Sequence, residues 1–353
     1  MIAIGVDAHK TIHVAVAVDD VGQEISTWSG PNHAAGWRSM FMWAASLDEQ
    51  RLWGIEGSGG YGRGLAQQLV AGEELVYEVN ARWTALGRRG SRKAGKTDRL
   101  DARAVALFVR QETSSLPQVL PEDNTAILGL LATEREAGLA EATRLRNQIH
   151  ALLLQVEPEY RSRLANLRSR ASLDTLEAYT PAEKGPVHEY RAASIRRLAR
   201  RLRLVFGQVD ELAEQIEELA AANFVPLTRL CGVNLLTAGA LAGILGPGKR
   251  FSSDAQLAAY AGAAPLEASS AGAVRHRLNR GGNRRLNAVL YRIALTQAHH
   301  LPEARAYLDR RVAEGKTRRE ARRALTRYIV RAVWRLWQEC TPASASVSLG
   351  EAA

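Results

Sequence analysis

The chain has 353 residues, of which 46% are hydrophobic, enough to bury sizeable cores in two or three domains. Lysine and arginine number 47 against 37 acidic residues, and the resulting formal charge of +10 favours a polyanionic partner such as nucleic acid. Two cysteines exclude a disulfide framework and a multi-thiolate zinc site, and without a signal-peptide pattern or an apolar run of about 20 residues we expect a cytoplasmic protein that does not enter a membrane.

Residues 1–120 are predicted to form a mixed α/β domain. IAIGVD at 2–7 and IHVAVAV at 12–18 are rich in strand-forming residues and are joined by a turn-like AHKT, which predicts a hairpin. RLWGIEG at 51–57 and LVYEV at 75–79 predict two further strands, with a helical segment between them. Strands and helices in this order indicate an α/β unit.

Residues 121–223 are predicted to be helical and to carry two heptad-spaced apolar seams. The spacing alternates between three and four with charged residues between, which predicts a coiled coil. The stretch YTPAEKGP at 179–186 separates the seams, so they could form an antiparallel hairpin, a contact between two chains, or both. The seam residues are Ala142, Leu145, Ile149, Leu152 and Val156, then Ile195, Leu198, Leu202, Val205, Val209, Leu212, Ile216 and Leu219.

Residues 224–340 form a third predicted region, which is helical and basic. Two apolar runs around a glycine-containing turn at 227–246 resemble a helix-hairpin-helix, whose backbone N–H groups can bind phosphates; ordinary helix packing is the alternative. The segment 275–292, RHRLNRGGNRRLNAVLYR, is dense in arginine and poor in acids, which favours contact with nucleic acid. Residues 341–353 are small and polar and are predicted to be a disordered tail.

Four carboxylates stand at positions where an α/β frame can bring them together. Asp98 and Asp101 are three residues apart in a predicted helix, so they share one face, whereas Asp7 and Glu56 each end a predicted strand. A helix cap or pairing with nearby arginines would explain the helical pair alone. Four clustered acids, however, require a cation, and oxygen ligands favour Mg²⁺ or Mn²⁺, which can bind phosphodiester oxygens and activate an attacking group.

Basic residues flank these acids and recur in the C-terminal region. We expect them to contact the phosphate backbone, because acids would hold the metal and bases the nucleic acid. The predicted nucleic-acid-binding residues are Lys93, Lys96, Arg99, Arg275, Arg277, Arg280, Arg284 and Arg285.

These motifs also carry a family resemblance. GVDAHK, GIEGSGGYG and KTDRLDA, in this order, resemble the four-acid RuvC-like motif of the DEDD transposases, close to the insertion-sequence 110 family and the related Piv-type DNA invertases. The segment 251–290 is similar to the family's second, transposase domain. The resemblance covers nearly the whole chain. It implies a ribonuclease-H-like (RuvC-like) N-terminal domain, a helical coiled-coil middle and a helical C-terminal transposase domain.

The same resemblance implies a serine nucleophile. The family supplies it a few residues after a Gly-x-x-Pro turn, and the matching residue is Ser270, five residues beyond Pro265, although Ala271 stands where the family often has glycine. Ser270 would attack the scissile phosphate and form a phosphoserine link, so rejoining would need no ATP. The resemblance further implies DNA element ends and target as substrates, a structured guide RNA, and a dimer or tetramer.

Two other functions stay open, and one motif is set aside. A structure-selective, Holliday-junction-resolvase-like nuclease would use the same acids to activate water without a covalent serine step. A non-enzymatic nucleic-acid-binding protein would need neither the activated water nor the covalent serine step. GSGGYG at 57–62 fits a dinucleotide-binding pattern, but an Asp-bearing hairpin precedes it and Glu56 would oppose the pyrophosphate charge.

Overall fold

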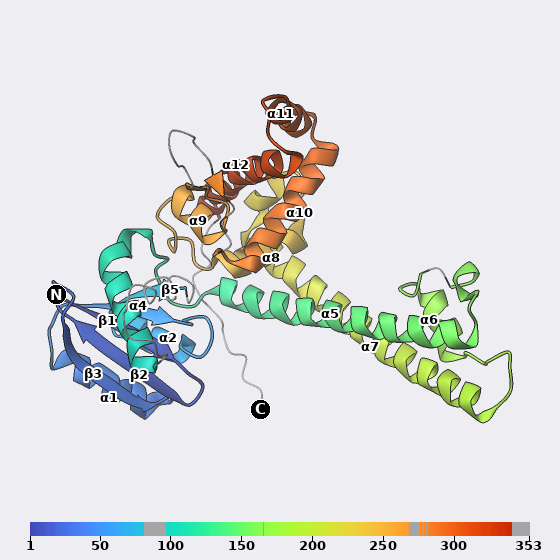
Figure 1. Ribbon diagram of the computed structural model, residues 1–353, viewed down its shortest axis with the longest axis horizontal. Helices are drawn as coiled ribbons and strands as arrows, with labels where there is room; N and C mark the ends of the chain where they lie inside the picture. Colours follow the sequence, from blue (N-terminus) through green and yellow to red (C-terminus); the bar gives the residue numbers. More distant parts are fainter. Residues whose placement is uncertain (81–96, 165, 268–275, 278, 280, 341–353) are drawn as a thin grey trace.

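A sheet-containing part, a long projecting helix pair and a second helical part make up the molecule (Figure 1). The computed structural model describes residues 1–80, 97–164, 166–267, 276–277, 279 and 281–340. Within these residues, no helix combines the length and apolar character needed to cross a membrane. The predicted C-terminal tail, 341–353, lies outside the described residues.

The N-terminal part is built on one five-stranded sheet. Its strands are β1 (Ile2–Ala8), β2 (Ile12–Val18), β3 (Glu24–Pro31), β4 (Arg51–Glu56) and β5 (Leu75–Val79). They lie in the order β3-β2-β1-β4-β5, with β1, β2 and β3 antiparallel and β4 and β5 parallel to β1. The predicted hairpin and the two later strands are confirmed, and this mixed sheet fits a ribonuclease-H-like domain.

Helices cover both faces of this sheet. On one face lie α1 (Ala34–Ala45) and α2 (Arg63–Ala71), which share a core with Ile2, Ile4 and Val6 of β1. On the other face lies α4 (Asp98–Glu112), followed by the short turn η1 (Thr113–Ser115). Because β1 is buried on both faces, its residues 2–6 are continuously apolar rather than alternating.

A glycine in β1 sets the distance between the sheet and α4. A Cβ built on Gly5 would lie 2.1 Å from the backbone oxygen of Ala102 and 2.1 Å from the backbone nitrogen of Ala106. Only glycine opposite small residues permits an approach this close. The contact matters because α4 carries two of the four predicted acids.

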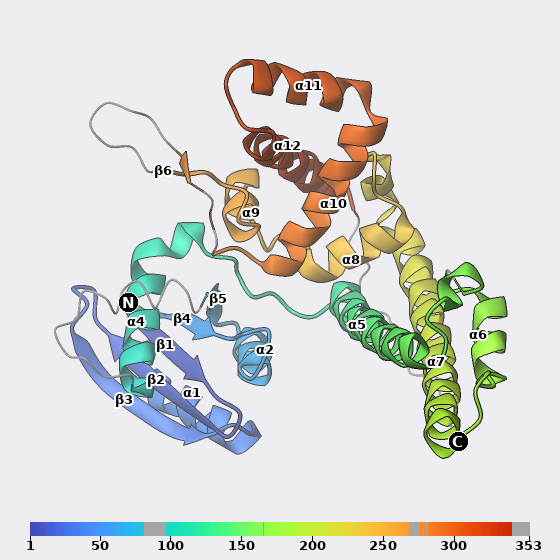
Figure 2. The ribbon, with the colours of Figure 1, turned by 45° about the vertical axis from the view of Figure 1, so that its right-hand side comes forward.

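Two long helices form the projecting middle part, α5 (Asn124–Val156) and α7 (Pro186–Asn223), linked through η2 (Tyr160–Ser162) and α6 (Arg170–Glu177). They run antiparallel and share one core within the chain (Figures 1 and 2). Most of the predicted seam residues are buried where α5 and α7 pack against each other. Leu152 and Leu198, however, are only partly buried, and their neighbours Leu153 and Ala199 are fully buried instead. Supercoiling and a contact between chains stay predictions.

The C-terminal part is mainly helical, as expected. Its elements are η3 (Val225–Arg229), α8 (Leu235–Leu245), α9 (Asp254–Tyr260), β6 (Leu266–Glu267), β7 (His276–Arg277), α10 (Arg284–His300), α11 (Pro302–Ala313) and α12 (Arg318–Gln338). An apolar stripe on α12, formed by Ile329, Val333 and Trp337, is buried in its core. The segment 227–246 begins with the end of η3, continues through a turn at Gly232 and ends in α8. Its first half is therefore not an α-helix, and the helix-hairpin-helix stays a prediction.

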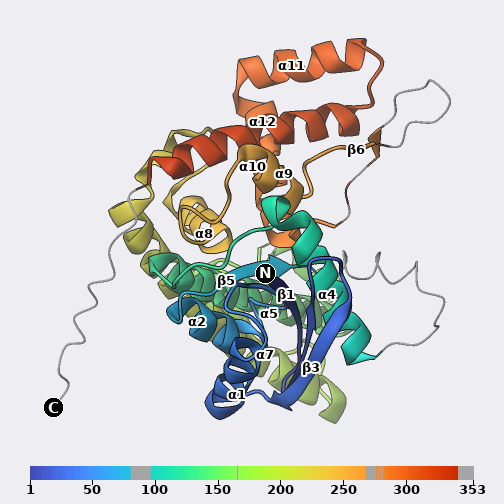
Figure 3. The same cartoon turned by 90° about the vertical axis from the view of Figure 1, so that its left-hand side faces the viewer.

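Arg250 joins the C-terminal part to the sheet. Figure 3 shows the helices of the C-terminal part above the sheet that contains β5. Its guanidinium is 2.5 Å from Glu78 of β5 and donates to Tyr260 Oη at 3.2 Å, and Asn283 Nδ2 donates to the same hydroxyl at 2.9 Å. Gln256 of α9 adds a hydrogen bond of 2.7 Å to the backbone oxygen of Leu116. We call Arg250, Glu78, Tyr260 and Asn283 the Arg250 clasp.

Candidate active site

Two of the predicted acids lie side by side at one edge of the sheet. Asp7 near the end of β1 is the register partner of Glu56 at the end of the parallel strand β4. Neighbouring strands are about 4.8 Å apart, and paired residues of parallel strands point to the same face. Asp7 is only 7% exposed. The sequence-based expectation that these strand ends converge therefore matches the register.

The other two acids lie in the first turn of α4. Thr97 caps this helix, since its side chain accepts a hydrogen bond from the Leu100 N–H at 3.3 Å; the cap is therefore not Asp98. Carboxylates in the first turn are favoured by the helix dipole. Asp101 faces the sheet and is 4% exposed, whereas the Asp98 side chain is 55% exposed.

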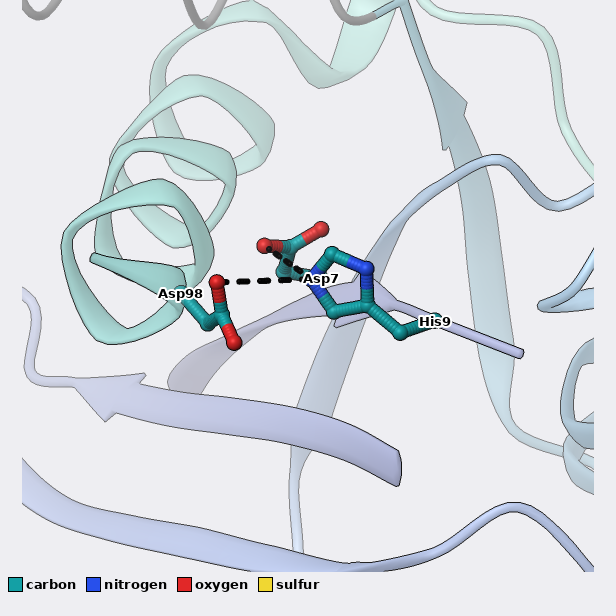
Figure 4. Close-up of side chains that lie close together, drawn as sticks. All are labelled: Asp7, His9 and Asp98. Atoms are coloured by element: carbon teal, nitrogen blue, oxygen red, sulfur yellow. Dashed lines mark hydrogen bonds and ion pairs between the residues drawn. The ribbon is translucent and has the colours of Figure 1, made fainter. Parts of the chain in front are cut away.

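A histidine that sequence reasoning missed connects the two pairs. His9 Nε2 lies 3.1 Å from Asp7 Oδ2 and 3.5 Å from Asp98 Oδ1, so the ring stands between a strand carboxylate and a helix carboxylate (Figure 4). One ligand atom from each of these residues lies within 4.8 Å of the others, a grouping that could hold a metal ion. One sequence signal could have identified His9: it follows Asp7 at i, i+2, a spacing that places both side chains on the same side of an extended chain.

The electrostatics of Asp7 also favour a cation. Burial raises the pKa of the Asp7 carboxyl, the neighbouring carboxylates of Asp101 and Asp98 raise it further, and the His9 ring opposes the rise. Carboxylates that disfavour one another's charge are stabilised by a positive ion among them. Their hard oxygen atoms fit Mg²⁺ or Mn²⁺, and His9 offers a nitrogen that Mn²⁺ also accepts.

Two loops frame this edge of the sheet. Gly57, directly after Glu56, has φ of +76°, which only glycine adopts readily. Asn32 Nδ2 donates to the backbone oxygens of His9 and Tyr61, both at 3.1 Å, and Trp37 Nε1 donates to Asn32 Oδ1 at 2.9 Å. Asn32 therefore ties the loop after β1 to the glycine loop after β4. The antiparallel β1–β2 hairpin also differs from the parallel unit of a dinucleotide fold.

The predicted basic residues do not all line this site. Arg99 is 64% exposed but pairs with Glu24 at 2.5 Å. Arg285 turns toward α5, where it pairs with Glu136 at 2.9 Å, whereas Arg284 beside it is exposed. Arg277 lies on β7.

Five predicted site residues lie outside the described residues. They are Lys93, Lys96, Ser270, Arg275 and Arg280. The segment just before the serine is described through Glu267, and its Gly262 has φ of +68° next to Gly282.

Comparisons with known proteins agree with the mixed α/β sheet of the N-terminal part and the mostly helical remainder. A family model for IS110-type DEDD transposases matches residues 4–158, and a second, for the transposase IS116/IS110/IS902 family, matches residues 226–309. An uncharacterized 43.6 kDa protein of insertion element IS110 from Streptomyces coelicolor is 29% identical over 70% of this chain and 71% of its own. An uncharacterized 42 kDa protein of insertion element IS900 from Mycobacterium paratuberculosis is 26% identical over 95% of both chains. The chain belongs to the IS110 family of DEDD transposases and is an enzyme of DNA transposition.

Proposed function

We propose that this transposase cuts and rejoins DNA strands with Ser270 as the nucleophile and a divalent metal held by Asp7, Glu56, Asp98 and Asp101. The observation that carries the proposal is the meeting of strand-end and helix-start carboxylates at one sheet edge. A DEDD domain implies use of a divalent metal, and the oxygen-rich donor set fits Mg²⁺ or Mn²⁺.

The four acids and His9 would have separate tasks. When bound, the metal supplies positive charge for phosphate oxygens and lowers the pKa of an attacking hydroxyl. Asp7 and Asp101, both buried, would hold it from fixed elements, while the exposed Asp98 meets the nucleic acid side. His9 would orient the Asp7 and Asp98 carboxylates through its Nε2 contacts.

The serine step conserves the number of phosphodiester bonds. The Ser270 Oγ–phosphorus bond forms as the bond from phosphorus to a sugar oxygen breaks, and the hydroxyl proton passes to a carboxylate while the leaving oxygen takes up a proton. Reversal with a different strand end would complete recombination without ATP. Support comes from the family's C-terminal model, which spans Ser270, and from the Arg250 clasp, which fixes Tyr260 ten residues before it to the sheet.

A structured guide RNA and a homodimer or homotetramer complete the proposal. The net charge of +10 supports a large polyanionic partner, although it does not select RNA over DNA. The long antiparallel helix pair, which projects from the rest of the molecule, is the proposed contact between subunits.

The test is to trap the covalent intermediate. Purified protein is incubated with Mg²⁺, element-end DNA and co-purified RNA, and denaturing gels are used to detect a protein–DNA adduct. We expect the adduct in wild type and in the neighbouring control Ser269→Ala, but not in Ser270→Ala; Asp7→Asn should abolish both cutting and adduct. If wild type and Ser270→Ala cut equally well without an adduct, the serine step is wrong and the protein is a metal-dependent nuclease.

A further inference from the structure

A large groove opens on the C-terminal part, and none of the residues of the acidic site is among its lining residues. It has a volume of about 1190 Å³ and is lined by α10, α11, α12 and the turn Gly262–Pro265. Figure 2 shows α10, α11 and α12 gathered together, with α9 and β6 beside them. None of the nucleic-acid-binding residues predicted from the sequence is among its lining residues.

The groove is strongly cationic. Its lining carries seven lysine and arginine side chains and, among these lining residues, a single carboxylate, Glu320. Some of the cations are neutralised: Arg327 pairs with Asp254 at 2.8 Å and Arg323 with Glu320 at 3.7 Å. In the part of the chain that the structure describes, no carboxylate lies within ion-pair distance of Lys316, Arg319 or Arg322. An excess of unpaired cations in a concave surface attracts polyanions.

Two of these cations stand where helix electrostatics disfavour them. Lys316 directly precedes the cap Thr317, and Arg319 is the second residue of α12. Positive charge at a helix N-terminus opposes the helix dipole, so the dipole does not account for the position of these two residues. Phosphate groups in the groove would interact favourably with both the side chains and the helix end.

Exposed tyrosine rings lie beside arginine side chains in the lining of the groove. Tyr291 is 46% exposed and Tyr328 is 55% exposed. The Arg322 guanidinium donates to Tyr291 Oη at 2.7 Å and lies 5.7 Å from the ring centroid, and Arg331 lies 5.9 Å from the Tyr328 ring. Exposed rings beside guanidinium groups stack on nucleobases, whose faces are free in a single strand and covered in a duplex. The aromatic content therefore favours single strands.

Some lining residues of the groove lie just before the proposed nucleophile in the sequence. Its lining includes Gly262 and Pro265, and Pro265 is five residues before Ser270. A strand bound along the groove would thus pass the turn that precedes the serine segment.

We propose that the groove between α10, α11 and α12 binds single-stranded nucleic acid, with Lys316, Arg319 and Arg322 on the phosphates and with Tyr291 and Tyr328 stacking on bases. The proposal extends the proposed function but does not depend on the serine step, because binding is measured without cleavage. The strand could be RNA or an unpaired DNA strand, and both share the chemistry that the groove recognises.

The test measures binding of labelled oligonucleotides by the full-length protein, using fluorescence anisotropy. The probes are a mixed-sequence RNA strand, the same sequence as single-stranded DNA, and its DNA duplex. Tyr291→Leu/Tyr328→Leu removes the rings and keeps the charge. It should weaken single-strand binding about tenfold or more and leave duplex binding unchanged. The control is Tyr190→Leu, which removes a ring that is 76% exposed on α7, outside the groove.

The charge is tested separately. Arg319→Gln/Arg322→Gln should lower the slope of log affinity against log salt for single strands by about 1.4, because each phosphate contact contributes about 0.7. The control Arg38→Gln/Arg170→Gln removes the same charge from exposed positions on α1 and α6 and should leave the slope unchanged.

The outcomes are distinguishable. A loss of binding for both RNA and DNA single strands supports the groove as a general single-strand site, and a loss for RNA alone or for single-stranded DNA alone supports it and identifies the strand that it binds. If the tyrosine variant binds single strands like wild type, or loses duplex binding to the same extent, the proposal is overturned. Adduct formation with element-end DNA, measured on the same wild-type sample, reports independently on the proposed serine function.

Discussion

Replacing Gly5 with alanine should move α4 away from β1 and disable the acidic site. The new Cβ would meet backbone atoms of Ala102 and Ala106 at 2.1 Å, whereas ordinary contacts begin at 3.4 Å, so the helix must shift by about 1 Å. Backbone atoms cannot rotate aside as side-chain ends can. Overpacking of this kind costs about 3 kcal/mol, and the lower entropy of the unfolded alanine chain offsets about 0.7 kcal/mol. We expect a net loss of about 2 kcal/mol.

A shift of this size also separates the helix acids from Asp7. Misplacement of about 1 Å can cost about 100-fold in rate, so Mg²⁺-dependent cleavage of element-end DNA should fall by about that factor. The control is Gly54→Ala, at the register partner of Gly5 on β4. Its Cβ would meet Val105 Cγ1 and Val109 Cβ at 3.0 Å, contacts that a few tenths of an ångström relieve.

Urea unfolding and cleavage are measured on both variants. The reasoning is refuted if Gly5→Ala unfolds at the wild-type urea concentration, or if it is destabilised and still cleaves at the wild-type rate. The second result would mean that the distance between α4 and β1 does not set the geometry of the acids.

Three further predictions concern buried groups. Arg250→Met leaves Glu78 without its cation at the domain contact and should cost about 3 kcal/mol in urea unfolding, and the double variant with Glu78→Gln should recover part of it. Burial raises the pKa of the Cys340 thiol to about 11, so at pH 8 iodoacetamide should alkylate the half-buried Cys231 first, as peptide mapping would show. Burial raises the pKa of Tyr179 to about 12 from 10.0, so the neutral phenol contributes stability that is complete below pH 10 and is lost as pH rises toward 12. Across that window the free energy of unfolding should fall more steeply in wild type than in Tyr179→Phe, by about 1.4 kcal/mol per pH unit.

Most of the sheet could be predicted because β1, β2, β4 and β5 are short apolar runs. The strand β3 was missed because its pattern is inverted: Ile25 is 47% exposed, while Ser26 points inward and accepts a hydrogen bond from Trp43. Helix α1 was missed because it has apolar residues on all sides, including Met42, which is 72% exposed. Periodicity detects an element only when polar and apolar residues separate by face.

Site residues could be predicted where their place at the end or start of a strand or helix puts them together. Contacts that depend on tertiary packing could not be predicted. Asp7 and Glu56 end strands and Asp98 begins a helix, so their placement follows from the pattern of elements. The Arg250–Glu78 pair joins residues 172 positions apart, and a charged residue has no pattern that marks it as buried. The shift from Leu152 to Leu153 in the helix pair likewise depends on how two helices of 3.6 residues per turn meet.

The two halves of the proposed site are held by different forces, which makes them separable by mutation. The acids depend on backbone packing between Gly5 and α4, so Gly5→Ala should impair every metal-dependent step. The Arg250 clasp joins the described part of the C-terminal region to the sheet, so under the proposed function Arg250→Met should impair only steps that use Ser270. In a metal-dependent nuclease without a serine step, Arg250→Met would leave cleavage intact while Gly5→Ala lowered it about 100-fold. An equal loss of cleavage in both variants would indicate that cutting itself needs the two domains correctly placed relative to each other, as a serine recombinase requires.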